Sequence, residues 1–158
     1  MSRRDLIRMT DEEVGSFLVE GRVVTCASVG PDGRPHLMPL WYVPDGEALL
    51  CWTYAASQKA KNLRRDPRAT LQIESGDSYE ELRGVMFEAD ADLIEAPEEV
   101  AAIGLRLALR YAPGDLTAED APSELRDFVA AQAGKRLALR FRPTRTVSWD
   151  HRKLAGKY

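Results

Sequence analysis

Apolar and polar residues alternate along several short segments of the chain, and these segments are rich in β-branched and aromatic residues. This pattern is typical of β-strands that bury one face. Turn residues join the first three segments, at Gly30–Gly33 and Pro44–Gly46, and predict an antiparallel meander. We expect six strands and, as an extension of the sheet, a seventh, over residues 22–29, 34–43, 47–54, 69–74, 85–94, 135–141 and 144–149.

Capping signals and apolar residues spaced three and four apart predict three or four helices. The first shows a capping-box pattern, with Thr10 as N-cap and Glu13 three residues later, and Gly21 supplies a stop. A short basic helix follows the third predicted strand. Apart from that one, the helices cover roughly residues 11–20, a segment that opens at Ala96-Pro97, and residues 122–133.

These elements predict a mainly β class with flanking helices, in a single domain over residues 1–158. A small closed barrel would leave no exposed strand edges, and a β-sandwich is the alternative that the pattern leaves open. Cys26 and Cys51 lie inside apolar strand segments, where we expect buried, reduced thiols rather than a disulfide.

Composition and missing motifs narrow the function. The chain is 44% hydrophobic, carries a net charge of −3, and has no apolar run near the ~20 residues of a membrane span, so we expect a cytoplasmic protein that binds neither membrane nor nucleic acid. Two histidines and the cysteine spacing do not suit a metal site. Rossmann, Walker and nucleophile-elbow motifs are absent. Few residues suit acid–base catalysis, which favours redox chemistry carried by a bound cofactor.

Positive charge gathers between the third and fourth predicted strands. From Tyr54 to Arg68 five cations accompany a single carboxylate, Asp66. Ser57 suits an N-cap, and Asp66-Pro67 ends a short helix. The helix start would therefore combine free backbone N–H groups, a hydroxyl and Lys59, which together can hold a phosphate. The alternative is a solvated basic helix face.

The segment from Leu49 to Ile73 resembles the pyridoxamine 5′-phosphate oxidase-like split-barrel family, which includes FMN enzymes and deazaflavin (coenzyme F-420) dependent reductases. The matching residues are Thr53, Ser57, Lys59, Asn62 and the Asp-Pro-Arg sequence at 66–68. Residues 148–158 resemble the C-terminal signature of actinobacterial family members, many of them grouped with the deazaflavin-dependent reductases, and residues 112–134 match least. The resemblance implies a six-stranded antiparallel split β-barrel, a homodimer, and a cofactor bound at the subunit interface.

Carried over to this chain, the resemblance assigns Ser57, Gln58 and Lys59 to the cofactor phosphate. Asn62 belongs to the same group of cofactor contacts. Lys61 is either a surface charge or a contact to the acidic polyglutamyl tail of the deazaflavin.

The resemblance also assigns residues to the cofactor ring. Trp52 and Thr53 would line the ring or its ribityl-like chain. A strand segment would run along the ring through its backbone groups and comprises Met38, Pro39, Leu40 and Trp41. Because Pro39 cannot donate to a sheet ladder, we expect it at a sheet edge or a β-bulge. Trp149 and His151 would lie where the terminal strand approaches the partner subunit's cofactor.

Two departures from the family pattern affect the expected function. Pyridoxamine-phosphate oxidases carry Arg where this chain has Gln58 and Lys where it has Trp41, so oxidation of vitamin B6 is not expected. We expect an oxidoreductase that uses reduced coenzyme F-420 to transfer hydride to a conjugated small molecule. The alternatives are an FMN-binding oxidase-type flavoprotein and a non-catalytic module that binds flavin or haem. No catalytic side chain is identified, and the acceptor pocket is expected from residues 76–82 and the partner chain.

Overall fold

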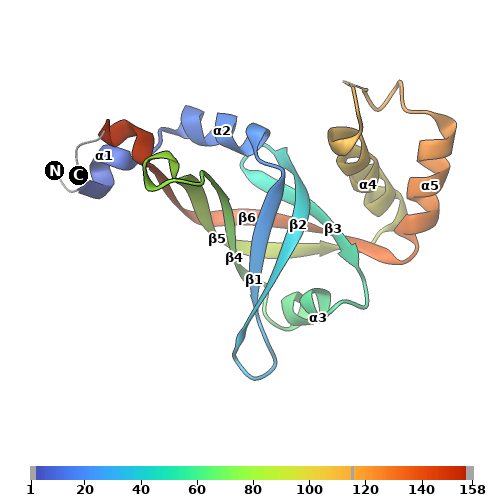
Figure 1. The fold of residues 1–158 in the computed structure, drawn as a ribbon. Coiled ribbons are helices and arrows are strands. Elements are labelled where there is room, and N and C mark those ends of the chain that lie inside the picture. The colour runs from blue at the N-terminus through green and yellow to red at the C-terminus, as the bar shows by residue number, and fades with distance from the viewer. Residues whose placement is uncertain (1–2, 115, 156–158) are drawn as a thin grey trace.

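Six antiparallel strands close into a barrel surrounded by helices (Figure 1). The computed structural model describes residues 3–114 and 116–155. Around the barrel the strand order is β1-β2-β3-β6-β5-β4, and β4 pairs with β1 to close it. The predicted mainly β class and six-stranded antiparallel barrel are confirmed, and the sandwich alternative is wrong. The strands are β1 (Val23–Val29), β2 (Pro35–Asp45), β3 (Ala48–Tyr54), β4 (Arg68–Ser75), β5 (Arg83–Ile94) and β6 (Arg136–Asp150).

The predicted seventh strand is wrong, because β6 runs without a break from Arg136 to Asp150. Pro143 lies inside it, at a shift in the pairing with β5 that occurs between Glu88 and Ala89. Glu88 pairs with Arg145, whereas Ala89 pairs with Pro143, so Thr144 is the extra residue of a bulge. The Thr144 hydroxyl donates to the Glu88 carbonyl at 3.1 Å. A proline is tolerated at such an irregularity because a ladder hydrogen bond is already missing there.

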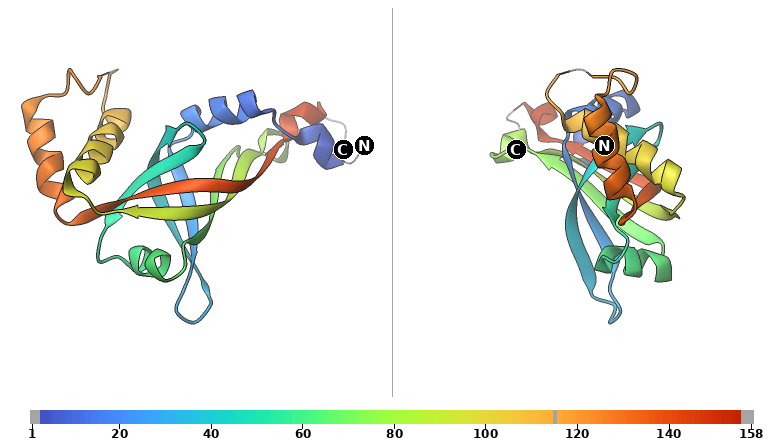
Figure 2. Two further views of the ribbon diagram at one scale, coloured as in Figure 1. Left: turned by 180° about the vertical axis from the view of Figure 1, so that it is seen from behind. Right: turned by 90° about the vertical axis from the view of Figure 1, so that its right-hand side faces the viewer.

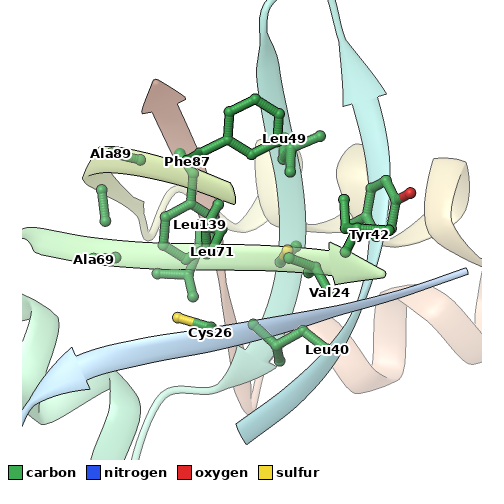
Figure 3. Close-up of a cluster of buried hydrophobic side chains, with 14 of the residues drawn as sticks. Val24, Cys26, Leu40, Tyr42, Leu49, Ala69, Leu71, Phe87, Ala89 and Leu139 are labelled. Carbon is green, nitrogen blue, oxygen red and sulfur yellow. The ribbon is translucent and has the colours of Figure 1, made fainter. Parts of the chain in front are cut away.

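The barrel interior holds the main hydrophobic core (Figure 3). Inward residues alternate with outward ones along each strand, as the period of two requires. Cys26 and Cys51 are buried free thiols in this core, as predicted. Burial raises the pKa of the Cys26 thiol to about 11, since the charged form loses its water. A second cluster lies outside the barrel, where Leu50 and Ala138 pack against Ile103 and Leu107.

The predicted helices form with closely matching ends. α2 (Asp11–Glu20) begins with the Thr10–Glu13 capping box and ends at Gly21. α3 (Gln58–Arg65) starts after Ser57 and stops at Asp66. α4 (Pro97–Tyr111) has Pro97 in its first turn, and α5 is Ser123–Ala133. No helix in the described ranges is long and apolar enough to cross a membrane.

Three short helical elements were not predicted: α1 (Arg3–Ile7) and the 3-10 helices η1 (Tyr79–Glu81) and η2 (His151–Leu154). They span five residues or fewer, too short for an apolar periodicity to be recognised. α1 and η2 pack together beyond one end of the barrel, whereas α4 and α5 form a pair at the opposite end (Figure 2).

The C-terminal end of α4 is fixed to the barrel and to α2 by two side chains. The Tyr111 hydroxyl accepts from the Tyr42 backbone N–H at 3.0 Å and lies 2.5 Å from the Arg22 carbonyl. The Tyr111 ring stacks on Trp41 with ring centroids 4.2 Å apart. Arg110 donates to three carbonyl oxygens at the end of α2. These contacts hold α4 against the outer face of β2 and β3.

Candidate functional site

The start of α3 lies directly after β3 and carries a linked set of polar groups. The Ser57 hydroxyl accepts from the Ala60 backbone N–H at 3.2 Å, which makes Ser57 the N-cap that the sequence predicted. The same hydroxyl lies 3.3 Å from Thr53 Oγ1. The first turn of α3 contains no acidic residue, so the positive end of the helix has no carboxylate on the helix itself.

Lys59 is buried, with only 6% of its surface exposed. Its ammonium donates to Thr53 Oγ1 at 3.1 Å, and among the described residues no carboxylate pairs with it. Burial lowers the pKa of Lys59 below its ordinary value, because the interior does not solvate a charge as water does. The solvated-helix alternative is therefore wrong for Lys59, although it describes the exposed Lys61. Lys59 is therefore a buried cation with no anionic partner among the described residues, an arrangement that costs free energy.

The side chains of Gln58 and Asn62 form hydrogen bonds with other groups of the same chain. Gln58 Nε2 donates to Asn62 Oδ1 at 2.8 Å, and Asn62 Nδ2 donates to Ser28 Oγ at 3.1 Å. Asn62 is fully buried, so this chain of bonds fastens α3 to β1. A direct contact between Asn62 and a cofactor would require these bonds to rearrange. The cofactor contact of Asn62 stays a prediction.

The strand segment from Met38 to Trp41 lies where the barrel opens. The β2–β3 ladder runs from Tyr42↔Cys51 to Asp45↔Ala48, whereas the β1–β2 ladder continues through Pro39 with no register shift. Pro39 is therefore at an edge, and the bulge alternative is wrong. Met38 and Trp41 are 44% and 58% exposed, whereas Leu40 turns inward. We refer to this opening between β2 and β3 as the split.

A cavity of about 350 Å³ opens beside this split, between the barrel wall and the α4–α5 pair. Four of the predicted cofactor contacts line it: Pro39, Leu40, Trp41 and Trp52. The other lining residues, which the sequence did not indicate, are Gly104, Leu107, Ala108, Phe128, Val129 and Arg136. Such a size and such largely apolar walls are typical of small-molecule sites.

Arg136 is the functional candidate that the sequence analysis missed. Its guanidinium lies 4.6 Å from the Trp52 ring centroid and 4.1 Å from that of Tyr54. Arg136 pairs with Tyr54 in the β3–β6 register, which brings it beside the aromatic strand. The clean alternation of Leu137 and Leu139 already places Arg136 on the outer face, but only the register shows which aromatic residues it meets.

Trp149, near the end of β6, and His151, in η2, lie at the opposite end of the barrel from the α4–α5 pair. They line a separate cavity of about 760 Å³ next to α1. The Trp149 ring packs closely on Gly84, where an added Cβ would come within 2.3 Å of it. His151 Nδ1 lies 2.9 Å from the Tyr79 carbonyl oxygen. One chain does not bring these residues to α3, so their predicted cofactor contact depends on a second subunit.

These residues together offer suitable groups for a phosphorylated flavin-type cofactor. A cation without an anionic partner, a capping hydroxyl and free helix N–H groups can hold a phosphate. The neighbouring strand edge can run along a planar ring system, and the aromatic cavity lies beside that edge. Two buried donors in the cavity wall, Trp52 Nε1 and Arg136 Nε, have no hydrogen-bond partner among residues 3–114 and 116–155. Folded proteins contain few such groups.

Solved structures share this fold over most of the chain. The conserved hypothetical protein Rv2991 from Mycobacterium tuberculosis is 39% identical, with a TM-score of 0.86 over 98% of this chain and 93% of that one. An F-420 reductase is 26% identical, with a TM-score of 0.59 over 83% and 93% of the two chains. HutZ, a haem storage protein from Vibrio cholerae, shares the fold at 18% identity, with a TM-score of 0.67 over 87% and 94%.

A family model agrees with the resemblance seen in the sequence. The model described as pyridoxamine 5′-phosphate oxidase matches residues 10–150, from the N-cap of α2 to the end of β6. The match includes the split between β2 and β3, the start of α3 and the cavity beside them. On this match and the shared barrel, the chain belongs to the pyridoxamine 5′-phosphate oxidase family.

Proposed function

We propose that this protein is an oxidoreductase that uses the deazaflavin coenzyme F-420 to reduce a conjugated small molecule. The observation that carries the proposal is the buried Lys59 ammonium, whose one hydrogen-bond partner in the part of the chain that the structure describes is a hydroxyl, beside the capped start of α3. A charged group is costly to bury without an opposite charge. A cofactor phosphate reaching Ser57 and Lys59 would supply that charge.

The identity of the cofactor is supported by a relative and by the charge pattern. The F-420 reductase that shares this fold is 26% identical to the chain. Gln58 and Trp41 stand where pyridoxamine-phosphate oxidases carry cations, so this chain offers fewer charges to FMN and to a phosphorylated substrate. FMN is the second candidate, because Ser57 and Lys59 suit either phosphate.

The chemistry divides between cofactor and protein. When bound, the reduced deazaflavin supplies a hydride to the carbon of a conjugated acceptor, and solvent supplies the proton that completes the reduction. The protein's residues bind and orient the cofactor, and they exclude water from the reacting atoms. Ser57 and Lys59 fix the phosphate end, and the strand from Met38 to Trp41 offers its backbone edge to the ring. The apolar walls of the neighbouring cavity keep water from the reacting carbon.

Titration with four ligands tests the proposal. We expect coenzyme F-420 to quench tryptophan emission saturably, because Trp41 and Trp52 line the cavity beside the ring site. FMN should bind at least about tenfold more weakly, a difference of about 1.4 kcal/mol. Riboflavin, which lacks the phosphate, should bind more weakly than FMN. Haem serves as the fourth ligand. Tighter binding of FMN would favour the flavoprotein alternative, and binding of haem alone would contradict the oxidoreductase proposal.

The proposal includes a homodimer, because Trp149 and His151 cannot approach α3 within one chain. Light scattering after size-exclusion chromatography should give twice the 17.6 kDa of a single chain. His151→Ala should then weaken cofactor binding without changing that mass. A monomer that binds the cofactor with full affinity would contradict the interface site.

A further inference from the structure

The cavity under the α4–α5 pair contains two hydrogen-bond donors that nothing in the described chain satisfies. Trp52 Nε1 and Arg136 Nε are both buried and have no partner. A buried donor left without an acceptor costs free energy, and folded proteins contain few of them. Both side chains line the same cavity and are the polar part of an otherwise apolar wall.

The guanidinium of Arg136 is the charged group of this cavity. All other lining residues are uncharged, and no carboxylate in residues 3–114 or 116–155 forms an ion pair with Arg136. Its stacking with Trp52 and Tyr54, at 4.6 and 4.1 Å, holds the planar group in place. An arginine held in this way presents paired N–H donors that match a carboxylate.

The rest of the wall is apolar and fits a flat molecule. Gly104 allows the close approach of Trp52, since a Cβ there would lie 2.7 Å from the indole. Phe128 and Trp41 are both about 60% exposed, and Tyr111 covers one face of Trp41, so both rings keep open surface at the cavity. The volume of about 350 Å³ suits one molecule of two or three fused rings.

We propose that this cavity is the acceptor site, and that its occupant is a planar aromatic or quinone-type molecule of two or three rings with a carboxylate that Arg136 binds. The role of this molecule as hydride acceptor rests on the proposed function, whereas its binding in the cavity does not. The residues proposed to bind the cofactor phosphate, Ser57 and Lys59, do not line the cavity. The segment from Pro39 to Trp41 lines it and also borders the split, which places an occupant next to the proposed cofactor ring.

Binding of 2-naphthoate, followed by tryptophan emission in the cofactor-free protein, tests the site. The neutral 2-acetylnaphthalene has the same rings without the charge and serves as the comparison probe. We expect 2-naphthoate to bind at least about tenfold more tightly, because a hydrogen-bonded ion pair is available to it alone. Equal affinities for the two probes would overturn the proposal.

Variants test whether the two probes bind in this cavity. Arg136→Gln should remove the preference for 2-naphthoate, and Arg136→Lys should restore part of it. Arg140→Gln is the matched control, because Arg140 lies on the same face of β6 but outside the cavity, and it should leave the preference unchanged. Ala108→Phe should block both probes. Retained preference in Arg136→Gln would overturn the assignment.

A cofactor titration separates this inference from the proposed function. Arg136→Gln should keep the wild-type affinity for coenzyme F-420, and the bound coenzyme should leave 2-naphthoate binding intact or tighter. Competition between the two would show that the cavity holds the cofactor ring and would overturn the acceptor assignment. If no cofactor binds but Arg136 still selects 2-naphthoate, the proposed function fails and the anion site stands.

Discussion

Lys59→Met is expected to stabilise the cofactor-free protein and to weaken cofactor binding. Methionine keeps the length of the side chain and removes a buried charge whose partner is a neutral hydroxyl. The gain should be about 1–3 kcal/mol in the free energy of unfolding, or a rise in Tm of roughly 3–10 °C. Affinity for the cofactor should fall about tenfold or more, because a charge-assisted hydrogen bond to phosphate is lost.

Lys61→Met is the control for Lys59→Met. Lys61 lies two residues further along α3 and is exposed, so its replacement should change stability by less than about 0.5 kcal/mol. Thermal unfolding and tryptophan quenching measure the two effects separately. A loss of stability in Lys59→Met would show that the ammonium is well satisfied inside the protein. Unchanged cofactor affinity would remove Lys59 from the phosphate site.

The stability change caused by Lys59→Met should depend on pH. In the folded protein burial holds the pKa of Lys59 below its ordinary value of 10.5, so the unfolded chain binds the proton more tightly. The resulting penalty on folding is complete below the folded pKa and disappears as the pH approaches 10.5. The stability advantage of Lys59→Met should therefore be largest near neutral pH and shrink on going to alkaline pH. An advantage that does not change with pH would show that the effect is packing rather than charge.

Arg110→Ala should lower stability more than a change to Arg106, another arginine of α4. The guanidinium donates to the carbonyls of Leu18, Val19 and Gly21 at 2.7–3.0 Å and lies over the Tyr42 ring. Its loss leaves the end of α2 uncapped and releases α4 from it. We expect a decrease of about 2–3 kcal/mol, seen as a fall in Tm of roughly 5–10 °C.

Arg106→Ala provides the comparison on the same helix. Arg106 pairs with Asp45 at 3.0 Å on the exposed surface, and such pairs contribute less than about 1 kcal/mol. Urea unfolding of the two variants measures the difference directly. Equal losses would contradict the assignment of Arg110 as the link between α2 and α4.

Local chemical signals explain which elements the sequence predicted well. Thr10 and Glu13 fix the start of α2, and Ser57 with Asp66-Pro67 fix both ends of α3, because capping bonds form within a few residues. β6 was divided wrongly because Pro143 normally interrupts a strand. The compensating bulge depends on the register with β5, which the sequence of β6 alone does not contain.

In the candidate site, too, the sequence predicts what depends on neighbouring residues but not what depends on packing between distant elements. The positive charge at α3 was recognised, but the burial of Lys59 depends on how α3 packs on the barrel end, where Lys59 shares the buried face with Ala60 and Leu63. Arg136, Phe128 and Gly104 come from three elements that are distant in sequence. Their meeting around Trp52 depends on how α4 and α5 pack against the barrel wall.

The proline in the open stretch of β2 has a consequence for behaviour at high concentration. The Tyr42 N–H meets the Tyr111 hydroxyl on the β1 side, so by alternation along the strand the Pro39 nitrogen faces the gap toward β3. An intruding strand from another molecule would find no donor at that position and could not continue a ladder there. Pro39→Ala would add the missing N–H, and with it the first step toward strand exchange and aggregation.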